Sequence, residues 1–144
     1  MRQEWVDWFI KQANTRLLNL ELRDKPSRKY CYTNLGLNEV PFHMEFKSWL
    51  SKYVDRDVFD MECYHLHVWE VGDHFDEHTD NFKRRMFTYV NELQSSDCEG
   101  GLYIDDQLIT EGVFPTHTPH RVDKIQSGKR ISLTVFGYEP PSLL

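Results

Sequence analysis

Apolar residues recur at helical spacing in two stretches of the N-terminal third of the chain. The first stretch predicts an amphipathic helix with an apolar stripe of Trp5, Trp8, Phe9, Ala13, Leu17 and Leu20. A second helix is predicted after Pro41, since the first turn of a helix does not need the missing N–H. Its apolar side consists of Phe42, Phe46, Trp49, Leu50 and Tyr53. Residues 23–39 between them are polar and contain Pro26 and Gly36, so we expect a loop there.

From residue 61 onward the pattern changes to the alternation that is typical of strands. The stretch "MECYHLHVWEV" is rich in aromatic and β-branched residues, and five further short runs follow it: "RRMFTYVNEL", "GGLYI", "LITEGVF", "PHRVDKI" and "RISLTVFGYE". Turn signals separate these runs, among them Asp105 with Asp106 and residues 126–129. Two helices followed by about eight strands predict a mainly β fold, with the helices packed on one side of an antiparallel jelly-roll (cupin-like) barrel.

Length and composition narrow the class of protein. A chain of 144 residues with 40% hydrophobic residues predicts one domain, 1–144, in which residues 1–58 support a barrel formed by residues 59–140. No apolar run is long enough to span a membrane, and the charged N-terminal stretch is unlike a signal peptide. We therefore expect a cytoplasmic protein whose cysteines, Cys31, Cys63 and Cys98, are reduced. The net charge of −6 opposes binding of nucleic acid.

The stretch "HFDEHTDNF" holds candidate metal ligands. If it forms a strand, His78 and Asp80 point to one face, because residues two apart on a strand share a face. A third ligand has to come from His117 or from His120, which opens a predicted strand. Two histidines and one carboxylate on one face of an ion leave three positions open, as in non-haem Fe(II) oxygenases. The pair alone is better explained by an ordinary polar loop.

Arg130 opens the last predicted strand and shares a face with Ser132 and Thr134. An arginine at the inner end of a barrel strand is costly to bury unless a carboxylate pairs with it. Its guanidinium suits bidentate binding of a carboxylate. If Arg130 faces the same cavity as the metal ligands, its partner is a small dicarboxylate that chelates iron at its other end.

These segments together resemble the 2-oxoglutarate/Fe(II)-dependent dioxygenases of the prolyl 4-hydroxylase type. The resemblance covers residues 60–139 and is carried by "VGDHFDEHTD", "TYVN", "EGG", "EGVFPTHTPHRV" and "SGKRISLTVFGY". It implies a double-stranded β-helix in which His78, Asp80 and His120 bind Fe(II). It also implies that Arg130 and Tyr89 bind the distal carboxylate of 2-oxoglutarate, with the Thr134 hydroxyl nearby.

The activity implied by this resemblance is hydroxylation of a substrate C–H bond, with consumption of O₂ and release of succinate and CO₂. A prolyl residue of a peptide or protein is the expected substrate, followed by a free amino acid or another small molecule. Ascorbate is a candidate reductant. Further candidate pocket residues are His67, Trp69, His74 and Ser132. The sequence does not set the oligomeric state.

The chain departs from the family pattern at three places. Trp69 stands where many relatives have a tyrosine, and Arg85 stands where a threonine is common. Only 39 residues separate Asp80 from His120, which indicates a compact member with a trimmed loop.

Three alternatives remain open at the level of sequence. His65, His67 and Glu70 are a candidate cupin-type site, although their spacing differs from the one expected. A nucleic-acid oxygenase of the same superfamily would carry a second arginine where this chain has Phe136. The third alternative is a barrel that binds a partner without catalysis.

Overall fold

The computed structural model describes residues 1–16, 20–80, 82–95 and 100–141. These residues form two α-helices, one short 3-10 helix and ten strands. The helices are α1 (Gln3–Thr15), η2 (Leu37–Glu39) and α2 (His43–Val54). The strands are β1 (Glu21–Lys25), β2 (Arg28–Gly36), β3 (Cys63–Trp69), β4 (His74–His78), β5 (Arg85–Gln94), β6 (Leu102–Ile104), β7 (Gln107–Ile109), β8 (Glu111–Pro115), β9 (His120–Val122) and β10 (Arg130–Tyr138). None of the helices in these ranges is long and apolar enough to cross a membrane.

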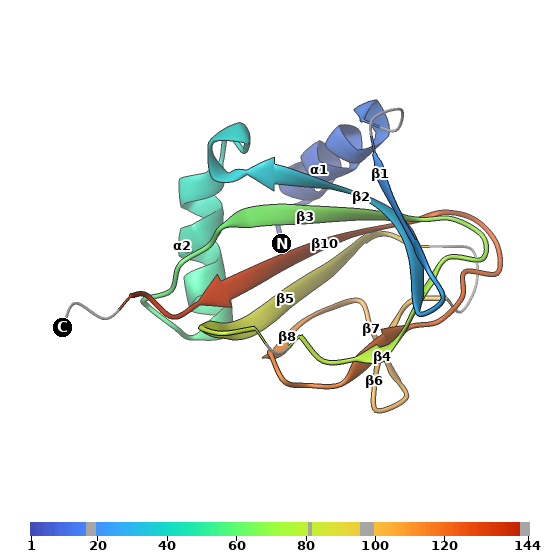
Figure 1. The fold of residues 1–144 in the computed structure, drawn as a ribbon. Helices are drawn as coiled ribbons and strands as arrows, with labels where there is room; N and C mark the ends of the chain where they lie inside the picture. Colours follow the sequence, from blue (N-terminus) through green and yellow to red (C-terminus); the bar gives the residue numbers. More distant parts are fainter. Residues whose placement is uncertain (17–19, 81, 96–99, 142–144) are drawn as a thin grey trace.

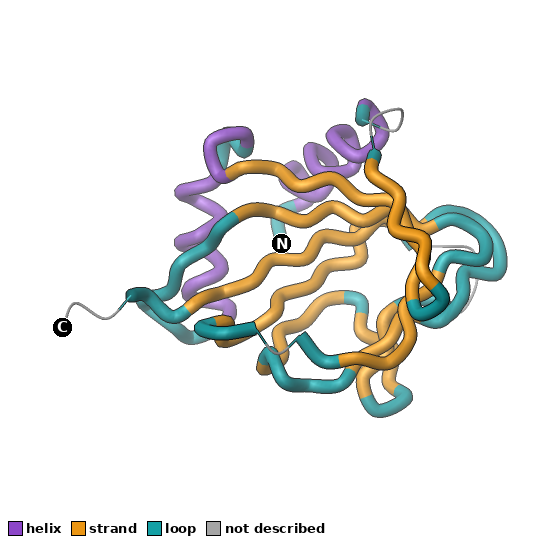
Figure 2. The backbone as a smooth tube through the Cα atoms, viewed as in Figure 1, coloured by secondary structure: helices purple, strands orange, loops and turns teal. Residues whose placement is uncertain are grey.

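The strands form a strongly curved antiparallel sheet with the order β7-β6-β9-β4-β2-β3-β10-β5-β8, and β1 extends it beside β2. Strands β2, β3, β10 and β5 lie side by side in front of the two helices, as Figure 1 shows, while β4, β6 and β7 fold over below them. The same curvature is visible in the strand trace of Figure 2. The predicted jelly-roll architecture with two flanking helices is therefore confirmed.

Alternation along the central strands divides their side chains between two faces. On β10, Ile131, Leu133 and Val135 are fully buried in the core beneath the helices. On α2, Phe46 is also fully buried, and its ring lies 5.2 Å from that of Tyr64 on β3. Burial of this apolar face against α1 and α2 is the main contribution to stability. The opposite face of the same strands is left to line the space between the two halves of the barrel.

Most of residues 23–39 lie in strands β1 and β2, and residues 37–39 form η2, so the prediction of a loop was wrong. The polar composition hid a real alternation, in which Tyr30 and Tyr32 face the interior of the barrel while Leu35 packs under the helices. Pro26 lies in the turn that joins the two strands, where it does not interrupt the pairing. Residues 1–58 therefore contribute two strands to the barrel as well as its helical support.

Two other sequence predictions were tested at turns and strand ends. The turn at Asp105 and Asp106 is confirmed, with φ angles of 49° and 63° in the left-handed region that tight hairpins require. The run "LITEGVF" is divided between β7 and β8, because Thr110 lies between two separate pairings. Leu17 and Cys98, which the sequence assigned to the first helix and to the reduced cysteines, lie outside the described residues.

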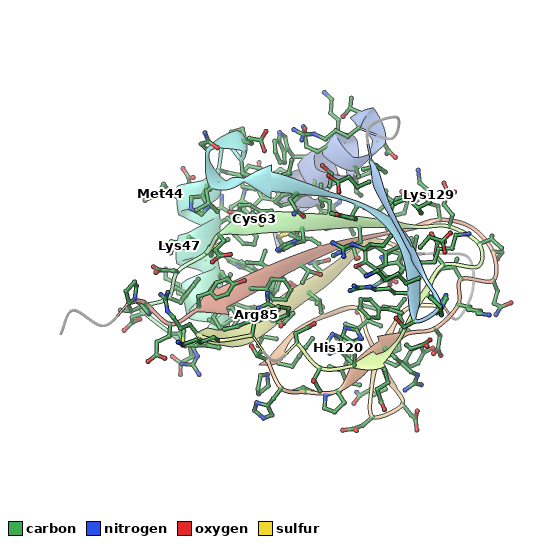
Figure 3. The ribbon with its side chains drawn as sticks, in the orientation of Figure 1. Met44, Lys47, Cys63, Arg85, His120 and Lys129 are labelled. Carbon is green, nitrogen blue, oxygen red and sulfur yellow. The ribbon has the colours of Figure 1, made fainter. Side chains whose placement is uncertain are left out.

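We predict that Phe46→Ala lowers the free energy of unfolding by about 3–5 kcal/mol, because it removes a fully buried ring and leaves a cavity. Met44→Ala, two residues away on the outer side of α2 (Figure 3), is the matched control, since 75% of Met44 is exposed. Urea unfolding of both variants measures the difference. Equal destabilisation by the two changes would contradict the packing described above.

Candidate metal centre

Strands β4 and β9 bring His78 and His120 together. The two strands are paired antiparallel, and His78 lies directly opposite His120 in their register. Strand β4 ends at His78, so Asp80 is not placed by strand alternation as the sequence suggested. Instead, the chain turns after β4, and the N–H of Asp80 donates to the carbonyl oxygen of Thr116 at 3.3 Å. The expected convergence of the three side chains is nevertheless found.

The three side chains have the spacing of a metal-ligand set. One donor atom from each of His78, Asp80 and His120 lies within 4.8 Å of the other two. Nε2 of His120 is 3.1 Å from Oδ2 of Asp80, and Nε2 of His78 is 3.6 Å from Oδ1. One carboxylate thus faces two imidazole nitrogens, and all three point at a common position. Among the described residues this is the only cluster of three such ligands.

Backbone carbonyls orient both imidazole rings. Nδ1 of His78 donates to the carbonyl oxygen of Asp76 at 2.8 Å, and Nδ1 of His120 donates to that of Thr118 at 2.9 Å. A proton on Nδ1 leaves the Nε2 lone pair free for an ion, and such carbonyl partners typically fix the rings of metal-binding histidines. Figure 3 shows His120 on the lower half of the barrel.

The local electrostatics favour an ionised Asp80 and a neutral His78, whereas His120 holds its proton more firmly. Burial raises the pKa of Asp80, but hydrogen bonding to His120 and the charges of His120, His78 and Arg85 outweigh burial and lower it. Burial lowers the pKa of His78. For His120, burial is outweighed by the contact with Asp80, which raises its pKa. A divalent cation would replace the proton that His120 shares with Asp80.

The three residues lie on the wall of a cavity of about 290 Å³ between the two halves of the barrel. Its opposite wall is the polar face of β3, β5 and β10. Apolar side chains fill much of the remaining wall, among them Val90, Leu102, Phe114 and Val122. The cavity therefore combines apolar side chains with many polar and charged ones, and it is concave enough to hold a small molecule.

Arg130 lies in this cavity wall and is only 3% exposed. Its Nε donates to Oε1 of Glu92 at 2.8 Å, whereas its buried Nη1 has no hydrogen-bond partner. The sequence suggested that the counter-charge of Arg130 would come from a ligand alone, and that expectation has to be corrected. Glu92 neutralises one edge of the guanidinium, and a buried donor remains unsatisfied on another nitrogen.

Glu92 was missed because its partner is distant in the sequence. It lies opposite Ser132 in the β5–β10 register, and Ser132 shares the cavity face with Arg130. Knowledge of the β5–β10 register would have indicated Glu92 as a partner of Arg130. Burial lowers the pKa of Arg130, and the charge of Glu92 opposes this shift, so the guanidinium stays protonated.

Four other predicted residues also line the cavity, namely His67, Trp69, Ser132 and Thr134. Nε1 of Trp69 donates to Oγ of Ser132 at 3.0 Å, and the guanidinium carbon of Arg130 lies 5.4 Å from the Trp69 ring centroid. Trp69 therefore closes the wall beside Arg130 instead of offering a hydroxyl to a ligand. Burial lowers the pKa of His67 to about 3, so this imidazole is neutral near pH 7.

Tyr89 lies outside the cavity, which does not agree with its expected contact with 2-oxoglutarate. Its ring is fully buried on the helix side of β5, and its hydroxyl donates to Oε2 of Glu111 at 2.7 Å. Thr88 and Val90, its neighbours on the strand, face the cavity instead. A one-residue difference in register transfers a side chain to the opposite face of a sheet.

His74 and His117 also lie away from the cavity lining. Nε2 of His74 is 3.3 Å from the carbonyl oxygen of Pro26, so this ring links the start of β4 to the turn between β1 and β2. His117 is exposed. In the candidate cupin-type site, Glu70 is exposed and Nδ1 of His65 is 2.9 Å from Oδ1 of Asn34. These residues do not form a second ligand set.

The residues present fit an Fe(II) ion with a carboxylate cosubstrate. Two imidazoles and one carboxylate from one side of an ion leave its other positions open, which suits iron that binds a chelating ligand and O₂. Arg130 lines the same cavity, and its buried Nη1 has no hydrogen-bond partner in the protein. One cavity thus offers both a metal position and an anion position.

Comparison with known proteins by sequence gives no match: no model of a protein family matches the chain, and no curated protein does. Comparison of structures gives many matches. A prolyl 4-hydroxylase from Pseudomonas putida has a TM-score of 0.72 at 16% identity, and the match covers 98% of this chain and 89% of that one.

Two further solved structures agree with this likeness. The viral collagen prolyl hydroxylase of Paramecium bursaria Chlorella virus-1, in its 2-oxoglutarate complex, has a TM-score of 0.71 at 17% identity, covering 97% of this chain and 92% of that one. A 2OG-Fe(II) oxygenase family oxidoreductase from Burkholderia pseudomallei has a TM-score of 0.61 at 10% identity, covering 90% and 78%. The chain therefore has the fold of the prolyl 4-hydroxylase-like 2-oxoglutarate/Fe(II) oxygenases.

Proposed function

We propose that the protein is a 2-oxoglutarate- and Fe(II)-dependent oxygenase that hydroxylates a C–H bond. The observation that carries this proposal is the presence of two complementary positions in one cavity. His78, Asp80 and His120 converge on a point at one wall, and Arg130 keeps an unsatisfied buried donor at another. The likeness to solved oxygenase structures supports the proposal at the level of the fold.

Each polar residue has a distinct task in this proposal. His78, Asp80 and His120 would hold Fe(II), with their rings fixed by the carbonyls of residues 76 and 118. Arg130 would receive the distal carboxylate of 2-oxoglutarate through Nη1, while Glu92 holds the guanidinium in place. Fe(II) supplies activation of O₂: one oxygen atom enters the substrate C–H bond, and the other oxidises 2-oxoglutarate to succinate and CO₂.

The cavity walls would protect this chemistry from water. Leu102, Phe114 and Val122 come from the lower half of the barrel and pack with Val90 and Trp69 of the upper half. Exclusion of water strengthens the interaction between Arg130 and a bound carboxylate, because charges interact more strongly in a medium of low dielectric constant.

For the substrate, we propose a prolyl residue of a peptide or protein, since two of the similar solved structures are prolyl hydroxylases. A small molecule is the second candidate, and the observation in its favour is the cavity volume of about 290 Å³, near the lower limit for ligand sites. Ascorbate as the reductant and the cytoplasm as the compartment complete the proposal.

We expect Asp80→Ala to lower the affinity for Fe(II) by more than about tenfold and to abolish 2-oxoglutarate turnover, because the site loses its only carboxylate ligand. Asp76→Ala is the matched control on the preceding strand, because its side chain is exposed and only its backbone carbonyl contacts His78. Anaerobic equilibrium dialysis measures iron binding, and succinate formation measures turnover. Retention of both properties by Asp80→Ala would refute the assignment of the metal site.

Arg130→Lys tests the anion position. Lysine keeps a positive charge beside Glu92 but loses the planar fork, so we expect 2-oxoglutarate to bind at least about tenfold more weakly, about 1.4 kcal/mol. Calorimetric titration of the Mn(II)-loaded protein with 2-oxoglutarate gives this affinity, and Mn(II) binding itself should be unchanged. An unaltered affinity for 2-oxoglutarate would show that its carboxylate binds elsewhere.

A further inference from the structure

Arg85, the first residue of β5, lines the cavity and is held between aromatic rings. Its guanidinium carbon lies 3.5 Å from the ring centroid of Phe136 and 4.2 Å from that of Phe82. Its Nη2 donates to the hydroxyl of Tyr138 at 3.0 Å. Figure 3 shows Arg85 near the ends of β5 and β10, on the side of the molecule where α2 lies. The rings and the hydroxyl fix the plane of the guanidinium before any ligand binds.

One donor of this guanidinium has no partner in the protein. Its Nε is buried without a hydrogen-bond partner, and no carboxylate among the described residues forms an ion pair with Arg85. A buried, unsatisfied donor on a cation is costly and needs an explanation. The mechanism proposed above does not use it, because Arg130 already provides the position for the cosubstrate.

The lining of the cavity also carries more cationic than anionic side chains. Its described lining residues include four arginines, Arg23, Arg28, Arg85 and Arg130, but only one carboxylate, Asp80. Glu92 behind the wall offsets Arg130, and the charges of Fe(II) and the 2-oxoglutarate dianion cancel each other. The cavity therefore keeps a positive excess with the cosubstrate bound, although the whole chain has a net charge of −6.

The cosubstrate cannot account for Arg85 as well as Arg130. Arg85 stacks on Phe136, which lies six positions after Arg130 on β10, and six residues of a strand span roughly 20 Å. A five-carbon dicarboxylate that chelates the metal and contacts Arg130 does not reach the other end of this strand. Asp80 lines the same cavity as both arginines, so one cavity holds the metal position, Arg130 and Arg85.

We propose that Arg85 binds a carboxylate of the substrate and thereby presents a nearby C–H bond to the metal. This inference rests on the oxygenase function proposed above and names its substrate class, a carboxylate-bearing amino acid or peptide. The carboxylate has two sources, the α-carboxylate of a free amino acid or an acidic side chain next to the reacting residue of a peptide. A guanidinium with a fixed plane favours this planar anion. The aromatic rings of Phe82 and Phe136 would contact the aliphatic part of the same residue.

The test uses Arg85→Gln and Arg85→Lys in the full chain, with Lys83→Gln as the matched control. Lys83 is two residues away and exposed, and it lies outside the cavity lining, so its variant changes the net charge equally. Succinate formation is measured with free amino acids, their amides, and prolyl peptides that carry Glu or Gln after the proline. The free acids and amides test the first source of the carboxylate, and the Glu and Gln peptides test the second.

We expect a carboxylate-bearing probe to stimulate succinate formation and its neutral counterpart to fail. Arg85→Gln should raise the KM for that probe by about tenfold or more, with a smaller effect for Arg85→Lys and none for Lys83→Gln. The affinity for 2-oxoglutarate should not change in any of them. Equal activity with neutral probes, loss of 2-oxoglutarate affinity in Arg85→Gln, or no response to any carboxylate would each overturn the proposal.

Failure of the substrate proposal is distinguishable from failure of the proposed function. In the first case the wild-type protein still binds Fe(II) and 2-oxoglutarate together, as binding measurements without any substrate would show. In the second case it does not bind them, and the substrate proposal is overturned together with the function on which it rests. Thermal unfolding of the Arg85 variants separates a loss of substrate binding from a loss of folding.

Discussion

The alternation of side chains across strands β3, β5 and β10 is the constraint on which the rest of the structure depends. Odd-numbered positions of β10, such as Leu133, lock the sheet onto the helices, and even-numbered positions, such as Arg130, then have to face the cavity. Burial of the apolar side chains on one face thus decides which side chains face the cavity on the other. A slip of one residue would place the arginine in the aromatic core and would leave the apolar residues in the cavity.

The polar groups of the cavity differ in how far other residues satisfy their hydrogen-bonding capacity. Asp80 and His120 satisfy each other by direct contact, and Arg130 is partly satisfied by Glu92. Arg130 and Arg85 each keep a buried donor without a partner. Unsatisfied buried donors are rare in proteins, and the residues that line this cavity hold three unpartnered buried groups, Nε of Arg85, Nη1 of Arg130 and Oγ1 of Thr88. The two cationic groups agree with positions for anions that the chain itself does not supply.

The sequence predicted the local features well because they depend on short-range patterns. Both helices, most of the strands and the turn at Asp105 and Asp106 followed from periodicity and turn chemistry. The convergence of His78, Asp80 and His120 followed from spacing together with a family resemblance, and the structure brings these three together. Their role as iron ligands stays a prediction.

The sequence did not predict features that depend on pairing between distant segments. Glu92 and Arg130 are 38 residues apart, and only the β5–β10 register shows that they meet. The hairpin of β1 and β2 has polar residues that hide its alternation until its neighbours in the sheet are known. Tyr89 matched a motif, but the register turned its ring toward the helices, which a motif without a register cannot reveal.

The most direct test of the account is an anaerobic titration of the wild-type protein with Fe(II) and then with 2-oxoglutarate, followed by visible absorption. The account predicts a metal-to-ligand charge-transfer band that appears only when both are present, because the metal position and the anion position share one cavity. A protein that binds iron but develops no such band would contradict the central claim, since the chelate would then not form between these residues.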